Sequence, residues 1–194
     1  MRYKVLKYLG CAGWAFTYVC FVAIAYNYHW CMIPLVVCAY NISYEFLYTT
    51  LATDKGQRLR NGIWFGLDMF VIYSYIKTVS VFDWFLFWVS IMLAIQIVLN
   101  LRISKELTKS FAWVTTLVMA VLLIYNPPPF YSNWVVLALI GKILGDGFYG
   151  LANGFYGIPG VNRKSLYGRF LLFTIIGASV FNLIALYHYV TFFK

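Results

Sequence analysis

The stretch Asn41-Ile-Ser-Tyr44-Glu45-Phe46-Leu-Tyr48 places a carboxylate inside a segment that is otherwise apolar and aromatic, from Trp30 to Leu51. A second acid has a similar setting in Trp64-Phe-Gly-Leu-Asp68, which follows one short basic loop. An ionisable side chain at membrane depth is costly, so it indicates a function. We therefore expect the rest of the chain to enclose these two acids in the interior of the protein.

The composition predicts an integral membrane protein. The chain has 194 residues, of which 63% are hydrophobic and 11% are charged, whereas a soluble domain contains about 25% charged residues. The length suits one domain, residues 1–194. The net charge is +9, but the basic residues lie in short loops between apolar spans. This pattern favours a lipid bilayer as the partner and argues against a nucleic acid.

Seven segments are long and apolar enough to cross a bilayer, which takes about 20 residues in a helix. They are residues 9–27, 31–51, 62–80, 84–102, 110–126, 133–153 and 168–191. The fifth ends at Asn126-Pro127-Pro128-Pro129, because proline cannot continue a helix. The sequence therefore predicts an all-α fold, a polytopic bundle of seven transmembrane helices.

The basic residues predict the orientation of this bundle. With seven spans, twelve of the 15 Lys and Arg residues fall on one side, at the N-terminus and in the second-to-third, fourth-to-fifth and sixth-to-seventh loops. Cytoplasmic loops carry the excess of positive charge in membrane proteins. We expect a cytoplasmic N-terminus, in a bacterial inner membrane or the endoplasmic reticulum.

Three acids share one depth in the cytoplasmic half of the predicted bundle. At about 1.5 Å per residue, Glu45 and Asp68 lie roughly 10 Å from the cytoplasmic ends of their helices, and Asp146 lies roughly 12 Å from its own. We predict catalytic roles for these acids. Gln96 falls near the same level, and Asn41 shares a helix face with Glu45 one turn away. We expect substrate contacts from the amides Asn41, Gln96 and Asn182.

Aromatic residues make up 21% of the chain, more than the two membrane interfaces require. Aromatic faces stabilise cations, and a carboxyl group buried among them keeps its proton because desolvation disfavours the charged form. An acid in such a cavity can make and guide a carbocation. The rings expected to line the cavity are Tyr44, Tyr48, Trp64, Tyr73, Trp113 and Tyr149.

A structural interpretation of the polar residues stays open. Polar side chains hydrogen-bond between membrane helices for about 1 kcal/mol each, and Lys142 can pair with Asp146 across one helical turn. The glycine-rich stretch Gly145–Gly150 lies inside an apolar span, which favours close helix packing. His29 and His188 form no metal-binding pattern, and we expect neither a metal nor a cofactor.

The second predicted helix resembles that of the small seven-helix integral membrane terpene cyclases of meroterpenoid and indole-diterpene biosynthesis. In that family the helix starts with a Met-Pro-Leu-type sequence and carries a motif like Asn-x-x-Trp-Glu-Phe-x-Tyr. Here Met32-Ile-Pro34-Leu35 precedes the stretch from Asn41 to Tyr48, with Tyr44 in place of the tryptophan.

Two further stretches carry the resemblance. The family's third helix often has a Trp four residues before an acid or amide and ends in Tyr-x-x-(Ile/Leu)-Lys. Here Trp64 precedes Asp68, and Tyr73-Ser-Tyr-Ile76-Lys77 follows. The family's second essential acid lies in its last helix, in a stretch like Asp-Gly-x-Tyr-Gly. Here Asp146-Gly-Phe-Tyr149-Gly150 is similar but belongs to the sixth predicted helix.

The resemblance implies a terpene cyclisation without a metal. Glu45 would give a proton to an epoxide or terminal alkene of a prenyl chain, with Asp68 or Asp146 as its partner or as the final base. The implied substrate is a lipophilic prenylated or epoxyprenyl aromatic or indole, supplied by a neighbouring prenyltransferase and epoxidase. Two other functions stay open: a small-molecule or proton-coupled transporter that uses the acids as a relay, and a structural subunit.

Overall fold

The computed structural model describes residues 2–51, 55–75, 88, 90–93, 95, 105–156, 162 and 164–193. Every regular element in these ranges is an α-helix, so the prediction of an all-helical fold is confirmed for them. Most of the predicted fourth span, including Gln96, lies outside the described residues. The described helices are α1 (Arg2–Tyr28), α2 (Leu35–Leu51), α3 (Lys55–Tyr75), α5 (Lys105–Tyr125), α6 (Asn133–Tyr156) and α7 (Leu166–Phe192).

The helix boundaries follow the predicted spans at their apolar ends and extend beyond them at their basic ends. Helices α1 and α3 begin at Arg2 and Lys55, two turns before the predicted spans. Lys and Arg are good helix formers, so the basic segments continue the helices instead of forming loops. Helix α5 ends at Tyr125, directly before the Asn126–Pro129 segment.

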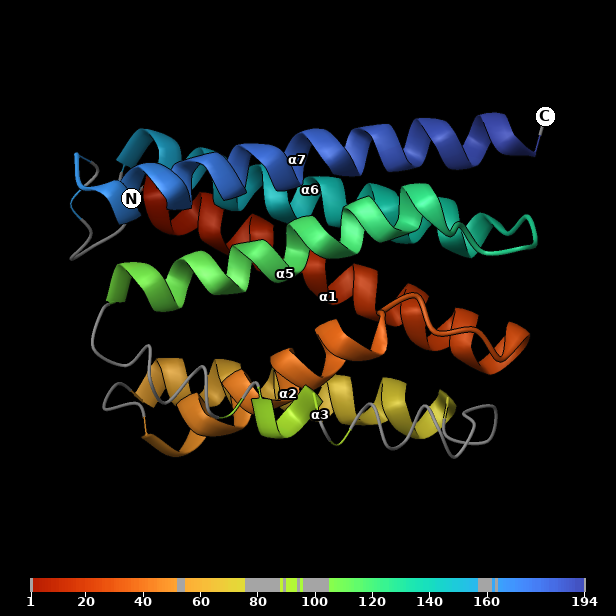
Figure 1. Cartoon of the computed structure of the whole chain (residues 1–194), viewed down its shortest axis with the longest axis horizontal. Helices are drawn as coiled ribbons and strands as arrows, with labels where there is room; N and C mark the ends of the chain where they lie inside the picture. The colour runs from red at the N-terminus through yellow and green to blue at the C-terminus, as the bar shows by residue number, and fades with distance from the viewer. Residues whose placement is uncertain are drawn as a thin grey trace.

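The helices run side by side along the long axis of the molecule (Figure 1). Helix α1 packs on α6, α6 on α7, and α7 on α5, whereas α2 packs on α3. Contacts of α1 with α3 and of α2 with α5 join the two groups. Helices α1, α3, α5 and α7 all begin at the same end of the bundle, the left in Figure 1, which we call the basic end.

Glycines allow α1 and α6 to approach closely. A Cβ atom on Gly13 would lie 2.6 Å from the backbone nitrogen of Gly145, and one on Gly145 would lie 2.6 Å from Cδ1 of Trp14. Gly141 and Gly145 are four residues apart and present one small-residue face, as in close membrane helix pairs. The expected packing role of Gly145 is therefore confirmed, and this contact brings Trp14 next to the polar residues of α6.

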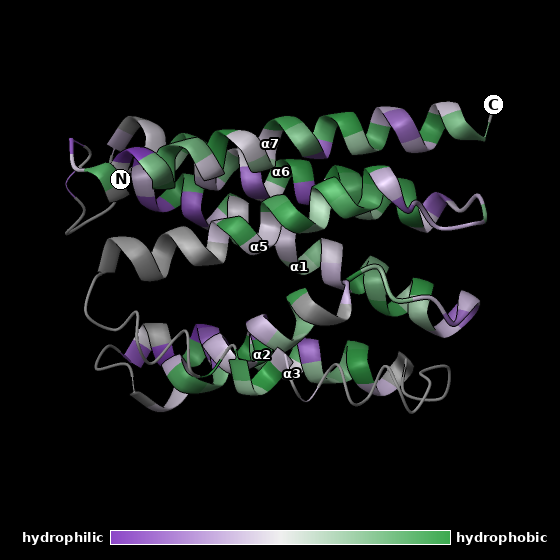
Figure 2. Ribbon diagram, viewed as in Figure 1, coloured by the Kyte–Doolittle hydropathy of each residue, from purple (hydrophilic) through white to green (hydrophobic). Residues whose placement is uncertain are grey.

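Three of the described helices are long and apolar enough to cross a membrane: α1, Asn133–Gly154 of α6 and Gly168–Phe192 of α7. Their middle portions are largely hydrophobic (Figure 2). Helix α7 also exposes large apolar side chains along its length, among them Phe173, Ile176 and Leu183. Apolar surface of this extent is typical of a protein that contacts lipid, so the structure supports membrane association.

Candidate functional site

Helices α2 and α3 bring two of the predicted acids together. The carboxyl groups of Glu45 and Asp68 lie within hydrogen-bonding reach of each other. Asp68 is fully buried and Glu45 is only 9% exposed. We call these two residues the carboxyl pair. The structure therefore places Asp68 as the direct neighbour of Glu45.

One carboxyl oxygen of Asp68 is held by α1. The hydroxyl group of Tyr18 donates a hydrogen bond of 2.6 Å to Oδ1 of Asp68, and both side chains are buried. The Tyr18 ring also contacts Trp64, with centroids 5.3 Å apart. Trp64 lies one turn before Asp68, so the same face of α3 carries the acid and the ring that packs beside its donor.

The other oxygens of the carboxyl pair define where its proton lies. When both groups are deprotonated, Oε2 of Glu45 and Oδ2 of Asp68 accept no hydrogen bond from the described residues. Two carboxylates cannot hydrogen-bond to each other unless one of them carries a proton. One proton between the two groups would satisfy both buried oxygens, and it would also remove the repulsion between like charges.

Asp146 belongs to a different centre, on α6. Its Oδ2 accepts from Nζ of Lys142 at 3.0 Å and from Nδ2 of Asn182 at 2.5 Å, and its Oδ1 accepts from Nε1 of Trp14 at 3.0 Å. Lys142 and Asp146 are both buried, so this is a buried ion pair. The possible pairing of Lys142 with Asp146 is thus present. We call these four residues the ion-pair centre.

The ammonium group of Lys142 has two further contacts. It donates to the backbone oxygen of Thr116 in α5 at 3.3 Å, and it lies 5.1 Å from the centroid of the Trp14 ring. Asp146 therefore faces a cation and two further donors. These contacts on both oxygens suit a structural or tuning role better than proton donation.

Helix α1 connects the two polar centres. Trp14 donates to Asp146 and Tyr18 donates to Asp68, and these two residues are one helical turn apart. Their rings are in contact, with centroids 6.2 Å apart. Sequence reasoning assigned no role to either residue. The available signal was the spacing of two hydrogen-bonding aromatics on one face of an apolar helix.

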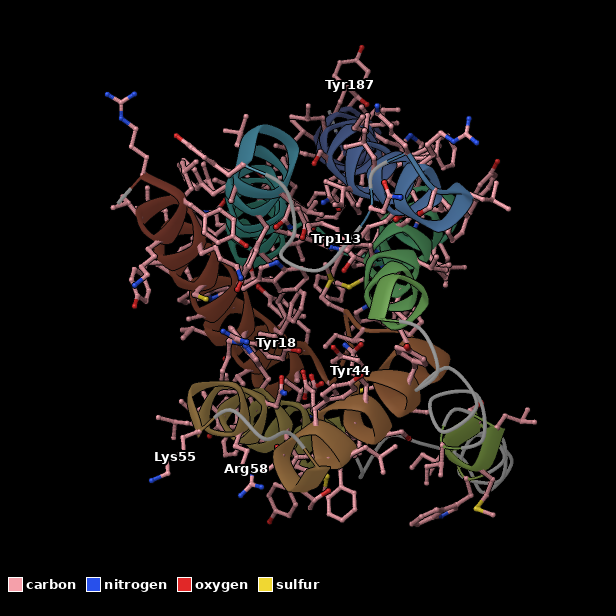
Figure 3. All side chains as sticks on the ribbon, turned by 90° about the vertical axis from the view of Figure 1, so that its left-hand side faces the viewer. Tyr18, Tyr44, Lys55, Arg58, Trp113 and Tyr187 are labelled. Carbon is pink, nitrogen blue, oxygen red and sulfur yellow. The ribbon has the colours of Figure 1, made fainter. Side chains whose placement is uncertain are left out.

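Rings from several helices point into the interior of the bundle. Figure 3 looks along the bundle from the basic end, and Tyr18, Tyr44 and Trp113 point toward the interior, whereas Tyr187 points outward. Tyr44 contacts the ring of Tyr48 at 4.5 Å between centroids. Trp113 contacts Tyr149 at 6.4 Å.

The remaining predicted site residues are placed differently. Tyr73 is 70% exposed, because five residues beyond Asp68 a helix turns a side chain to another face. Asn41 is partly buried, one turn from Glu45. Asn182 is fully buried and bonds to Asp146 rather than to the carboxyl pair. Gln96 lies outside the described residues.

The carboxyl pair can hold and release a proton in aromatic surroundings, and the ion-pair centre can fix charge beside it. In the part of the chain that the structure describes, no three His, Cys, Asp or Glu side chains are grouped to hold a metal ion. The chain matches no protein-family model, no curated protein and no solved structure.

Proposed function

We propose that the chain is a membrane-embedded terpene cyclase that starts a carbocation cyclisation by protonating a prenyl chain. The observation that carries the proposal is the buried carboxyl pair of Glu45 and Asp68, held by the Tyr18 hydroxyl among aromatic rings. The proposal includes the seven-span topology with a cytoplasmic N-terminus. It also includes a lipophilic prenylated or epoxyprenyl substrate that enters from the bilayer.

Glu45 is the proton donor in this proposal. Tyr18 occupies Oδ1 of Asp68, which favours Asp68 as the acceptor and leaves its Oδ2 for a proton carried by Glu45. In the reaction, that proton leaves Glu45 for the alkene carbon or the epoxide oxygen of the substrate. The substrate then carries one positive charge, and the carboxyl pair goes from one negative charge to two, which the cation beside it and the Tyr18 hydroxyl stabilise.

The surrounding rings supply the second requirement of the chemistry. A carbocation that moves along a prenyl chain needs an environment that stabilises positive charge and excludes water. Trp64 and Tyr18 pack beside the acid, and Tyr44 precedes Glu45. The cycle closes when Asp68, the ionised member of the carboxyl pair, takes a proton from the final cation and passes it to Glu45, which restores the starting state.

The direct test compares Glu45→Gln with a control in another acid, Glu106→Gln. Membranes that contain each variant are incubated with an epoxyfarnesyl aromatic substrate and a chelator, and isomeric products are separated by chromatography and mass spectrometry. A positioned general acid contributes roughly 10²- to 10⁴-fold, so Glu45→Gln should lose at least about a hundredfold in rate while the control keeps it. Cyclisation at the normal rate by Glu45→Gln would rule out Glu45 as the donor.

A transporter is the second candidate, and the ion-pair centre is the observation that favours it. A buried lysine, an aspartate and an asparagine whose Oδ1 has no partner among the described residues are typical of polar relays in carriers. Proteoliposomes separate the two functions. A transporter moves the substrate across the bilayer unchanged, whereas a cyclase changes its covalent structure without net flux.

A further inference from the structure

Four buried polar atoms of α2 and α3 have no hydrogen-bond partner within the described residues. They are Oε2 of Glu45, Oδ2 of Asp68, Oγ1 of Thr49 and Nδ2 of Asn61, and we call them the polar row. Glu45 is 9% exposed, Asn61 is 7% exposed and Asp68 is fully buried. Buried polar atoms without a partner are rare in folded proteins, so a group of them indicates that a small polar molecule binds there.

The polar row runs from the carboxyl pair toward the basic end. Thr49 lies one turn after Glu45 on the same face of α2, about 6 Å along the helix. A Cβ atom on Gly62 of α3 would lie 3.8 Å from Oγ1 of Thr49, so this hydroxyl lies against the turn of α3 that carries Asn61. Asn61 lies seven residues before Asp68, so these two side chains share one face of α3.

The outer end of the polar row lies close to the surface. Helix α2 ends at Leu51, two residues after Thr49, and α3 begins at Lys55, six residues before Asn61. Thr49 as a whole is half-buried, and its neighbour Thr50 is exposed. The row therefore leads from a buried pair of acids to the solution at one end of the bundle.

Water matches the chemistry and the spacing of the polar row. The Asn61 amide donates, the carboxyl oxygens accept and the Thr49 hydroxyl does both. The proton shared by the carboxyl pair occupies one lone pair on each buried oxygen, and the other lone pair can accept from water. One water with two hydrogen bonds of about 2.8 Å spans about 5.6 Å, close to the distance of about 6 Å along α2 between Glu45 and Thr49.

We infer that ordered waters bridge the polar row and form a path on which the carboxyl pair exchanges protons with the solution at the basic end. In the loading direction, a proton passes from the solution through these waters and the Thr49 hydroxyl to Glu45. The carboxyl pair thereby changes from two negative charges to one. The Asn61 amide holds a water by donating to it and carries no proton itself. This inference goes beyond the proposed function, because the exchange needs no substrate.

The test follows proton exchange in the full chain, reconstituted in lipid nanodiscs without substrate. After rapid mixing with D2O, the infrared band of a protonated carboxyl group moves to lower frequency, and Glu45→Gln identifies the band of the carboxyl pair by removing it. Loss of one hydrogen bond to a bridging water should slow the exchange about tenfold. We expect this result for Thr49→Val and for Asn61→Leu. Thr49→Ser keeps the hydroxyl and should keep the rate.

Two matched controls should leave the exchange rate unchanged. Thr50→Val makes the same replacement at the exposed neighbouring position. Ser43→Ala removes a buried hydroxyl on the other side of Glu45, one that already donates to the backbone oxygen of Ala39 at 2.7 Å.

Four results would overturn the inference. They are an unchanged rate in both Thr49→Val and Asn61→Leu, equal slowing in either control, slowing in Thr49→Ser as large as in Thr49→Val, and the absence of a carboxyl band that Glu45→Gln removes. If exchange behaves as expected while Glu45→Gln still cyclises at the normal rate, the proposed function fails alone. If Glu45→Gln stops cyclisation while exchange ignores Thr49 and Asn61, only this inference fails.

Discussion

The buried ion pair of Lys142 and Asp146 gives a prediction whose size can be worked from its contacts. Removing one partner of a buried pair costs about 3–5 kcal/mol, because the other charge stays buried and uncompensated. In Lys142→Met, Asp146 would still accept from Trp14 at 3.0 Å and from Asn182 at 2.5 Å. These two donors keep part of the stabilisation of the charge. We therefore expect the lower value, a loss of about 3 kcal/mol.

A double variant separates the pair from its surroundings. Lys142→Met combined with Asp146→Asn removes both charges, and the introduced amide oxygen can still accept from Trp14. The two single variants should each lose about 3 kcal/mol in free energy of unfolding. The double variant should lose about 3 kcal/mol less than their sum, because residues in direct contact are coupled. The free energies come from unfolding in mixed micelles with increasing denaturing detergent, followed by tryptophan fluorescence.

The control is Lys164→Met, the same replacement at an exposed position in the connection between α6 and α7. It should leave the free energy of unfolding unchanged. Strict additivity of the two single variants would refute the reasoning. So would a Lys142→Met variant as stable as the Lys164→Met control, because a buried and uncompensated Asp146 cannot be without cost.

Two further predictions concern α1. Tyr18→Phe removes the donor to Asp68 and should lower the cyclisation rate about tenfold, the value of one charge-assisted hydrogen bond. The same variant should shift the infrared band of the protonated carboxyl group, a band that Glu45→Gln should abolish. The control Tyr187→Phe should change neither the rate nor the band. Gly145→Ala places a methyl group 2.6 Å from Trp14 and should destabilise the protein by about 1–3 kcal/mol in the same unfolding assay. Gly147→Ala is its matched control, because a Cβ at Gly147 has no neighbour within 4 Å, and equal losses in the two glycine variants would contradict the close α1–α6 contact.

Hydropathy and proline predict where the described helices lie, because both act locally along the chain. The end of α5 before Asn126 and the apolar core of α6 required no tertiary information. The positions of Glu45, Asp68 and Asp146 along their helices follow from the rise per residue, and their common membrane depth stays a prediction. Which acid faces which could not be predicted, since that depends on how each helix is rotated and which helix lies beside it.

The partners of the acids show the same limit. Asp68 and Asp146 were equal candidates for the neighbour of Glu45, and the packing of α2 on α3 places Asp68 there. Tyr18 and Trp14 were not predicted as donors, because an aromatic residue in an apolar helix usually only packs. Lys142 was identified as a possible partner of Asp146 because the two residues are one turn apart in sequence.

The role of α1 as donor to two distant helices has a consequence for how the chain is made. Helix α1 leaves the ribosome before the other described helices, but the acceptor of Tyr18 follows 50 residues later and that of Trp14 follows 132 residues later. Until α6 has been made and has packed on α1, the indole N–H of Trp14 has no native acceptor, and the glycine face of α1 lacks the partner it has in the fold. In the proposed membrane topology, we expect chains that stop before α6 to leave α1 without its partner in the lipid, where quality-control proteases remove unassembled helices.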